Sequence, residues 1–146
     1  MRTKEFLSRL DHDRILEAIR RAESKTSGEI RIYIHRGDLK GDALAEAQKQ
    51  FVKLGVQKTR ERNGVLIFVA PRAQQFAVVG DEGVHAKCGE GFWQQLVEKM
   101  RAHFRGENFT AALVEAIDEA GELLAAHFPR TSADVNELSD EIVEGD

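Results

Sequence analysis

The sequence is poor in the features that mark disulfide-stabilised and membrane-spanning proteins. It contains one cysteine, Cys88, so no disulfide can form within the chain and folding does not depend on an oxidising compartment. No apolar run approaches the roughly 20 residues of a transmembrane helix. The first nine residues (1–9) are charged and lack the apolar core of a signal peptide. Together these absences predict a cytoplasmic protein without a membrane span.

A strong excess of positive charge is also absent, since the formal net charge is −4. Residues 131–146 hold six acids and no Lys or Arg, which leaves 21 basic and 19 acidic residues in 1–130. A body this close to neutral lacks the basic surface of a nucleic-acid-binding protein, so we expect no nucleic-acid partner. We expect residues 131–146 to be a disordered acidic tail; an interaction peptide is the alternative.

The remaining residues, 1–130, have the size and composition of one globular domain. The chain of 146 residues is 42% hydrophobic and 32% charged, which is ordinary for a folded protein and excludes disorder over most of its length. No internal repeat or low-complexity run interrupts this part. We therefore expect a single domain over 1–130.

The segment 63–83 dominates the pattern of the chain. Residues 65–70 form an unbroken run of β-branched, aliphatic and aromatic residues, typical of a strand covered on both faces. Residues 71–74 read as a turn, 75–79 as a second strand and 80–83 as an acidic loop. Two strands joined by so few residues must form an antiparallel hairpin, because a parallel return needs a crossover of about a dozen residues or more.

Before the hairpin the sequence predicts a helix, a strand and a second helix. Asp11 is a candidate N-cap for the first helix, which ends near residues 26–28. Residues 29–35 alternate apolar and polar side chains, which indicates a half-covered strand near a sheet edge. Asp42 is a candidate N-cap for the second helix, and Gly55 its end. This strand–helix–strand order predicts a right-handed crossover with parallel strands.

After the hairpin, apolar residues at helical spacing predict two further helices. The first carries Phe92, Leu96, Met100 and Phe104, and the second begins after Asn108 and ends before residues 128–129. With the earlier elements they predict an α/β protein of the three-layer α/β/α sandwich class. A small mixed sheet would lie between helices on both of its faces.

This topology predicts where the polar loops gather. The third strand runs opposite to the first two, so the loop after it lies at the end of the sheet where they begin. Asp81 and Glu82 should therefore lie near Glu29, Arg62 and Asn63. Residues distant in sequence would share one rim.

The acids of this rim are candidate ligands for a hard cation. Glu29, Asp81 and Glu82 supply carboxylate oxygens, which Ca²⁺ and Mg²⁺ prefer, and Gly80 and Gly83 allow the backbone to fold around an ion. In the alternative interpretation, Asp81 caps the following segment or pairs with an arginine of the rim. The dense acidic spacing of an EF-hand loop is absent, and both interpretations stay open.

Other reactive residues do not form a known catalytic pattern. His85 follows the acidic loop and is the one histidine to consider for acid–base chemistry, with a surface position as the alternative. Cys88 lies close to a helix start that could lower its pKa, but no paired histidine accompanies it. Trp93 is expected to be a packing anchor whose indole N–H finds a partner. The catalytic residues, if any, stay unknown.

Several motifs together resemble the TPM domain family. They are the strand motif at 62–70, the strand with its small-residue loop at 76–83, the segment 26–31, and the Phe104, Phe109 and Leu113 spacing at the last helix. The resemblance implies an α/β/α sandwich. Acid phosphatase activity and divalent-cation binding, chiefly of calcium, are attributed to some members of that family.

For this chain the resemblance implies a TPM-like domain that binds Ca²⁺ or Mg²⁺ through Glu29, Asp81 and Glu82 and has phosphatase activity. Arg62, Asn63 and His85 are the further candidate residues of the rim. A non-enzymatic module that binds a protein partner in the assembly or quality control of membrane proteins is the alternative. Many members carry a signal peptide and a C-terminal membrane helix, neither of which is recognised here.

Overall fold

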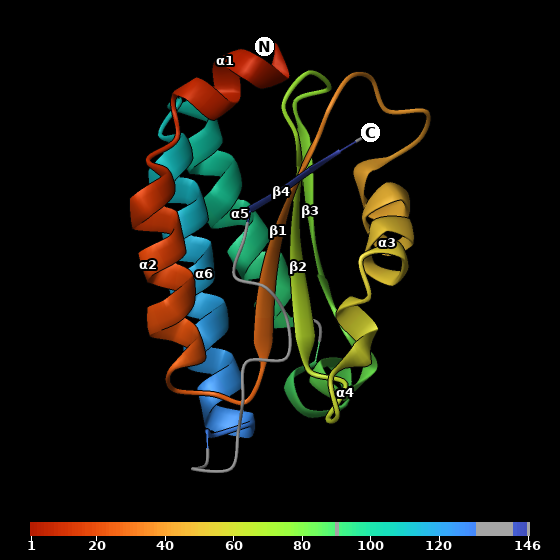
Figure 1. Ribbon diagram of the computed structural model, residues 1–146, viewed down its shortest axis with the longest axis vertical. Coiled ribbons are helices and arrows are strands. Elements are labelled where there is room, and N and C mark those ends of the chain that lie inside the picture. Colours follow the sequence, from red (N-terminus) through yellow and green to blue (C-terminus); the bar gives the residue numbers. More distant parts are fainter. Residues whose placement is uncertain (90, 131–141, 146) are drawn as a thin grey trace.

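The structure is a computed structural model that describes residues 1–89, 91–130 and 142–145 (Figure 1). A four-stranded mixed sheet in the order β3-β2-β1-β4 has α2, α5 and α6 on one face and α3 on the other. The strands are β1 (Glu29–His35), β2 (Gly64–Ala70), β3 (Gln75–Gly80) and β4 (Ile142–Gly145). The helices are α1 (Thr3–Ser8), α2 (His12–Glu23), α3 (Ala43–Lys53), η1 (Val56–Lys58), α4 (Glu82–Cys88), α5 (Gly91–Arg105) and α6 (Phe109–His127). The predicted α/β/α class is confirmed.

Strand directions follow the sequence prediction. β1 and β2 are parallel, with Glu29 opposite Gly64, and β2 and β3 form an antiparallel hairpin, with Val65 opposite Gly80. All seven residues of β2 are buried, as expected for the unbroken apolar run that fills this strand. The starts of β1 and β2 and the end of β3 therefore lie at one end of the sheet.

The fourth strand was not expected from the sequence. The predicted disordered tail, 131–146, falls largely outside the described residues, but residues 142–145 form β4, parallel to β1 with Ile142 opposite Ile32. For these four residues the prediction of disorder is wrong, because Ile142 and Val143 are β-branched residues that complete the hydrogen bonding of β1. Residues 29–35 do lie next to the edge strand, β4, but the prediction that they form a half-covered strand is wrong, because β1 is buried along almost its whole length.

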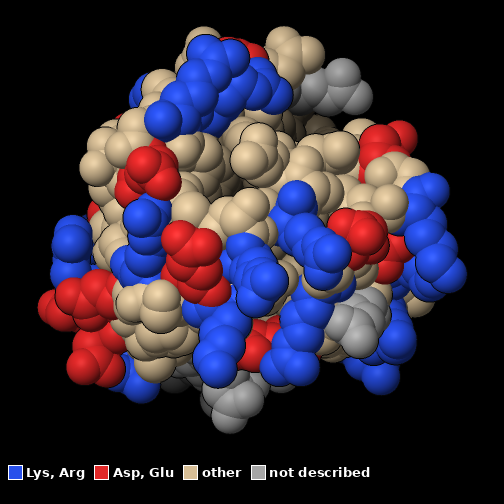
Figure 2. Space-filling view, turned by 90° about the horizontal axis from the view of Figure 1, so that it is seen from above, with Lys and Arg blue, Asp and Glu red and all other residues tan. Residues whose placement is uncertain are grey.

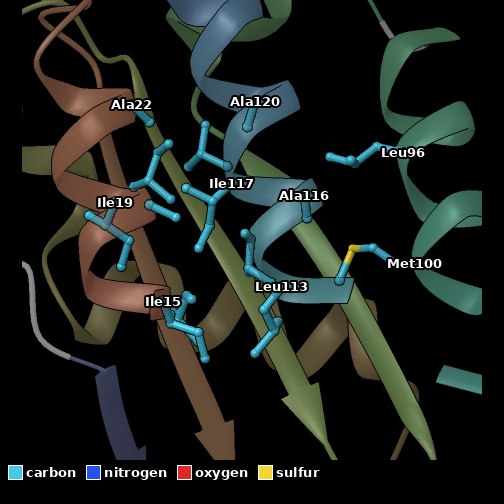
Figure 3. Close-up of a cluster of buried hydrophobic side chains, with 14 of the residues drawn as sticks. Ile15, Ile19, Ala22, Leu96, Met100, Leu113, Ala116, Ile117 and Ala120 are labelled. Carbon is cyan, nitrogen blue, oxygen red and sulfur yellow. The ribbon is translucent and has the colours of Figure 1, made fainter. Parts of the chain in front are cut away.

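The larger core lies between the sheet and the helix layer of α2, α5 and α6 (Figure 3). Ile30, Ile32 and Ile34 of β1 point into it. From the helices it is completed by Ile15 and Ile19 of α2, Leu96 and Met100 of α5, and Leu113 and Ile117 of α6. A smaller core on the other face packs α3 and η1 on the sheet, and includes Phe51, Val56, Leu66 and Phe68.

Capping side chains begin two of the helices as the sequence predicts. Asp11 accepts a hydrogen bond from the Arg14 amide at 3.2 Å, and Asp42 accepts one from the Ala45 amide at 2.7 Å. Of the loop expected at 80–83, Gly80 ends β3, Asp81 is the N-cap of α4, and residues 82–83 begin that helix. The sequence does not predict α4 because only Val84 of this short helix is buried. A helical stripe needs several apolar positions before it can be recognised.

Helices α2 and α6 approach each other closely at Gly121. A Cβ atom placed on Gly121 would lie 2.6 Å from the Cβ of Ala22 and 3.1 Å from its Cα. The contacting atoms belong to or adjoin the backbone of α2, so they cannot rotate away. The spacing of the two helices therefore depends on the absence of a side chain at this position.

We predict that Gly121→Ala destabilises the protein although it adds a better helix former. The overpacking cost, about 1–3 kcal/mol, should exceed the roughly 1 kcal/mol that alanine gains in helix propensity. Urea unfolding measures the difference. Gly91→Ala is the matched control, since a Cβ on Gly91 at the start of α5 meets nothing within 4 Å. Equal or higher stability of Gly121→Ala would contradict the close helix contact.

Candidate functional site

Three segments meet at the end of the sheet where β1 and β2 begin. They are residues 26–29 before and in β1, residues 59–64 before β2, and residues 80–85 after β3. The Asp81 amide donates a hydrogen bond to the Gly64 carbonyl at 2.9 Å, which continues the β2–β3 pairing by one residue. Asp81 and Glu29 therefore lie at the same end of the sheet, as the strand directions predicted.

Arg62 joins the two acids of the rim through its guanidinium group. Its Nε and Nη2 donate to the two carboxylate oxygens of Asp81 at 2.8 and 2.9 Å, and its Nη1 lies 3.0 Å from Oε1 of Glu82. The Asp81 side chain is 4% exposed, whereas those of Arg62 and Glu82 are 43% and 72% exposed. Hydrogen bonds to Asp81 raise the pKa of Arg62, which stays protonated. We call these three residues the rim triad.

Asp81 also begins α4. Its Oδ1 accepts a hydrogen bond from the Glu82 amide at 2.7 Å, and its carbonyl accepts from the Val84 and His85 amides. Both structural roles that the sequence suggested for Asp81, capping the next segment and pairing with an arginine, are confirmed. The carboxylate is thus held in place by its own backbone surroundings and by Arg62.

The backbone around the triad is tightly packed. Arg62 has a φ of +51°, in the left-handed region that residues with a side chain rarely adopt. A Cβ on Gly83 would lie 2.3 Å from the Glu61 carbonyl oxygen and 2.6 Å from that of Arg62. The Gly83 amide donates to the Arg62 carbonyl at 3.0 Å. The loop before β2 is therefore clamped against the start of α4, and only glycine fits at 83.

Asn63 ties the loop before β2 to the start of β1. Its Nδ2 donates to Ser27 Oγ at 3.1 Å and to Glu61 Oε2 at 3.2 Å, and the Ser27 hydroxyl donates to the same Glu61 oxygen at 2.8 Å. The backbone amide of Asn63 donates to Thr59 Oγ1 at 3.1 Å. Asn63 is 1% exposed, so this network fixes the rim from beneath and does not present a free amide to solvent.

Glu29 lies at the same end but apart from the rim triad. It is 2% exposed and pairs across the sheet with Gly64, which separates it from Asp81. Two strand spacings place their Cα atoms about 10 Å apart. A Cβ on Gly64 would lie 2.6 Å from both Cγ1 and the carbonyl oxygen of Val56, so η1 occupies the space between the two acids. The topology brings the three acids to one end without bringing them to one point.

The rim therefore offers few side-chain ligands for a metal ion. Within residues 1–89, 91–130 and 142–145 no three His, Cys, Asp or Glu side chains form a group that could hold a metal. Asp81 and Glu82 are the two carboxylates that share a partner, so a hard cation at the rim would need further oxygen ligands from water or the backbone. Such a donor set fits a weak, exchangeable cation site.

The other candidate residues lie on or beside α4. His85 occupies an exposed position on this helix. Trp93 is a packing anchor as expected, at 7% exposure, but its Nε1 receives no hydrogen-bond partner within the described part of the chain. Cys88 is the last residue of α4 and precedes the start of α5 by three residues, but the expectation of a lowered pKa is wrong. Burial raises the pKa of this half-buried thiol.

With the geometry in place, comparison with known proteins shows the family. A family model described as the TPM domain matches residues 1–123. The chain belongs to the TPM domain family. It is also similar to the solved NMR structure of the BA42 protein from the psychrophilic bacterium Bizionia argentinensis. The sequences are 34% identical, the match covers 94% of this chain and 96% of that one, and the TM-score is 0.85.

No curated protein matches this TPM domain. None of the helices in the described part of the chain combines the length and apolar composition of a bilayer-spanning segment. The family model and the similar solved structure confirm the resemblance seen in the sequence at the level of the family and the fold.

We predict that Cys88 is a poor nucleophile in the native protein. Because burial raises its pKa, the thiolate fraction at pH 8 is smaller than in the unfolded chain, and alkylation is slower. Iodoacetamide labelling over a pH series should give a midpoint at higher pH for the native protein than for the protein in urea. Comparing midpoints separates the pKa from simple access, which changes only the maximal rate. A native midpoint at or below the unfolded one would contradict the assignment.

Proposed function

We propose that this TPM domain binds a divalent cation weakly at Asp81 and Glu82, and that Arg62 neutralises part of their charge when no cation is bound. The observation that carries the proposal is the guanidinium between two carboxylates. One positive charge faces two negative charges there, so the triad keeps a net negative charge. A dication would neutralise both acids at once.

The exposed fractions of the triad side chains indicate which contact with Arg62 a cation would replace first. Glu82 is the most exposed member and its contact with Arg62 is a single ion pair, which contributes little at a solvated surface. Asp81 is buried and held by the α4 cap, so it stays in place as a fixed ligand. With two carboxylates and the rest water or backbone, we expect a dissociation constant in the range of about 10⁻⁴–10⁻³ M.

Hydrolysis of phosphate esters is the activity that the family resemblance suggests for this site, and we extend the proposal to it. A divalent cation, when bound, supplies positive charge to a phosphoryl oxygen and activates water. Arg62 offers a planar two-nitrogen fork that matches a phosphate group as well as the Asp81 carboxylate it now holds. In this proposal the attacking group is water, and Arg62 is the residue that positions the phosphate.

Calcium titration followed by amide NMR tests the binding step. We expect shifts centred on residues 80–85 and on Arg62, with millimolar affinity. Arg62→Met removes the internal cation and should tighten binding, whereas Asp81→Asn and Glu82→Gln should weaken it. Glu107→Gln is the matched control, since Glu107 is also exposed and paired with an arginine, Arg9, at the other end of the molecule.

Two results would overturn the cation site. One is the absence of shifts at 80–85 with 10 mM Ca²⁺ or Mg²⁺. The other is equal affinity in Asp81→Asn and Glu107→Gln. Thermal unfolding of each variant without cation verifies that the comparison is made on folded protein.

Hydrolysis of p-nitrophenyl phosphate, with and without Ca²⁺ or Mg²⁺, tests the activity separately. We expect cation-dependent turnover that falls at least about tenfold in Arg62→Met, because the phosphate loses its bidentate partner. If Arg62→Met tightens cation binding but no variant shows turnover, the result supports the cation site and contradicts the phosphatase assignment. That result would favour the alternative for this chain, a non-enzymatic protein-interaction module.

A further inference from the structure

We propose that the end of the molecule opposite the rim triad binds an amphipathic anion, an apolar chain with a carboxylate or phosphate head. The site is a cleft of about 820 Å³ at the tip of the β2–β3 hairpin, between the start of α3 and the end of α5. We call it the aromatic cleft. Its volume lies in the range of about 300–1,000 Å³ that is usual for small-molecule sites.

Four phenylalanines from separate elements line the aromatic cleft. Phe76 of β3 and Phe104 of α5 have ring centroids 4.9 Å apart, and Phe6 of α1 and Phe109 of α6 are also 4.9 Å apart. The Phe104 and Phe109 centroids are separated by 6.1 Å, which joins the two pairs. Phe6 and Phe109 are buried, whereas Phe76 and Phe104 keep part of their surface exposed. The cleft therefore has a rigid aromatic wall that a ligand can contact.

The opposite side of the cleft carries an apolar side chain that is unusually exposed to solvent. Leu44, in the first turn of α3, lines the cleft and is 50% exposed. Phe76 of the aromatic wall belongs to β3, which is an edge strand of the sheet. An apolar chain placed along this edge would cover Leu44 and the exposed parts of Phe76 and Phe104 together. Removing these surfaces from water is the driving force for binding.

The charges at the mouth of the aromatic cleft select an anion. Of its acids, Glu107 is paired with Arg9 at 2.8 Å, and Asp42 accepts the α3 capping bond at 2.7 Å. Arg101 lies over the Phe76 ring, with its Cζ 5.8 Å from the ring centroid, but its charge is paired with Glu98. The remaining cation is Arg105, which is exposed at the end of α5.

Within the described residues no acid is paired with Arg105, so its charge is available to a ligand head group. Figure 2 looks onto this end of the molecule and shows an uncharged hollow with Lys and Arg side chains around it, among which Asp and Glu side chains are interspersed.

A free fatty acid and a bilayer lipid share this chemistry. Dodecanoate below its critical micelle concentration represents the first source, and vesicles with and without an anionic phosphatidylglycerol represent the second. We expect dodecanoate to shift the amides of Leu44, Phe76 and the last turn of α5, with a dissociation constant that isothermal calorimetry measures. The affinity should fall with added salt, because Arg105 is exposed.

Two substitutions on the aromatic cleft and two matched controls make the test specific. Leu44→Glu removes apolar surface and repels the head group, and should weaken dodecanoate binding at least about tenfold. Arg105→Glu should weaken it about fivefold or more. Val52→Glu, on the same helix and 62% exposed outside the cleft, and Arg14→Glu, exposed on α2, should bind as the parent does. All four positions are exposed or half-exposed, so folding should be retained.

The outcomes separate the sources and can overturn the site. Dodecanoate binding that Leu44→Glu and Arg105→Glu weaken supports the proposal with a free acid as ligand. Binding to anionic vesicles weakened by the same two variants supports it with a lipid. No binding to either probe at millimolar concentration overturns it, and so does binding that the controls weaken equally. None of these results bears on the cation titration, because the two sites lie at opposite ends of the sheet.

Discussion

The rim of this TPM domain depends on one ion pair, in which Arg62 holds both carboxylate oxygens of Asp81. The pair connects the loop before β2 to the start of α4, two segments that the hairpin returns to the same end of the sheet. The Asp81 side chain is 4% exposed, and Arg62 is the cation that pairs with it, beside the hydrogen bond from the Glu82 amide. Arg62 in turn adopts a positive φ, a backbone conformation that residues with a side chain rarely adopt.

This arrangement gives the two ends of the sheet different chemistry. At one end, Asp81, Glu82 and Arg62 form a small polar cluster, where we propose that a dication binds. At the other end, phenylalanines from four elements and the arginines of α5 surround an open cleft. The parallel β1 and β2 and the antiparallel β3 keep these ends about one strand length apart. The two proposed sites are therefore spatially separate.

Much of this could be predicted from the sequence because the signals are local. The apolar run of β2, the capping aspartates Asp11 and Asp42 and the short turn of the hairpin each fix an element within a few residues. Strand direction then follows from connection length, which was enough to place Asp81 and Glu29 at one end of the sheet. The family resemblance rests on the same segments.

The rest could not be predicted because it depends on contacts between distant residues. Val56 fills the space over Gly64 and keeps Glu29 away from Asp81, and nothing in the local sequence around these residues indicates this. The pairing of β4 with β1 joins residues more than a hundred positions apart. Helix α1 was missed because Phe6 is its one buried residue, and its place becomes clear only from the rings of α5 and α6 around it.

The most direct test of the central claim is a double-mutant cycle on Arg62→Met and Asp81→Asn, measured by urea unfolding with and without 10 mM Ca²⁺. The claim predicts that the two substitutions are strongly non-additive without cation, because each removes the same ion pair. It also predicts that Ca²⁺ reduces this coupling, because the cation replaces Arg62 as the partner of Asp81. Additive effects, or a coupling that Ca²⁺ leaves unchanged, would contradict the account.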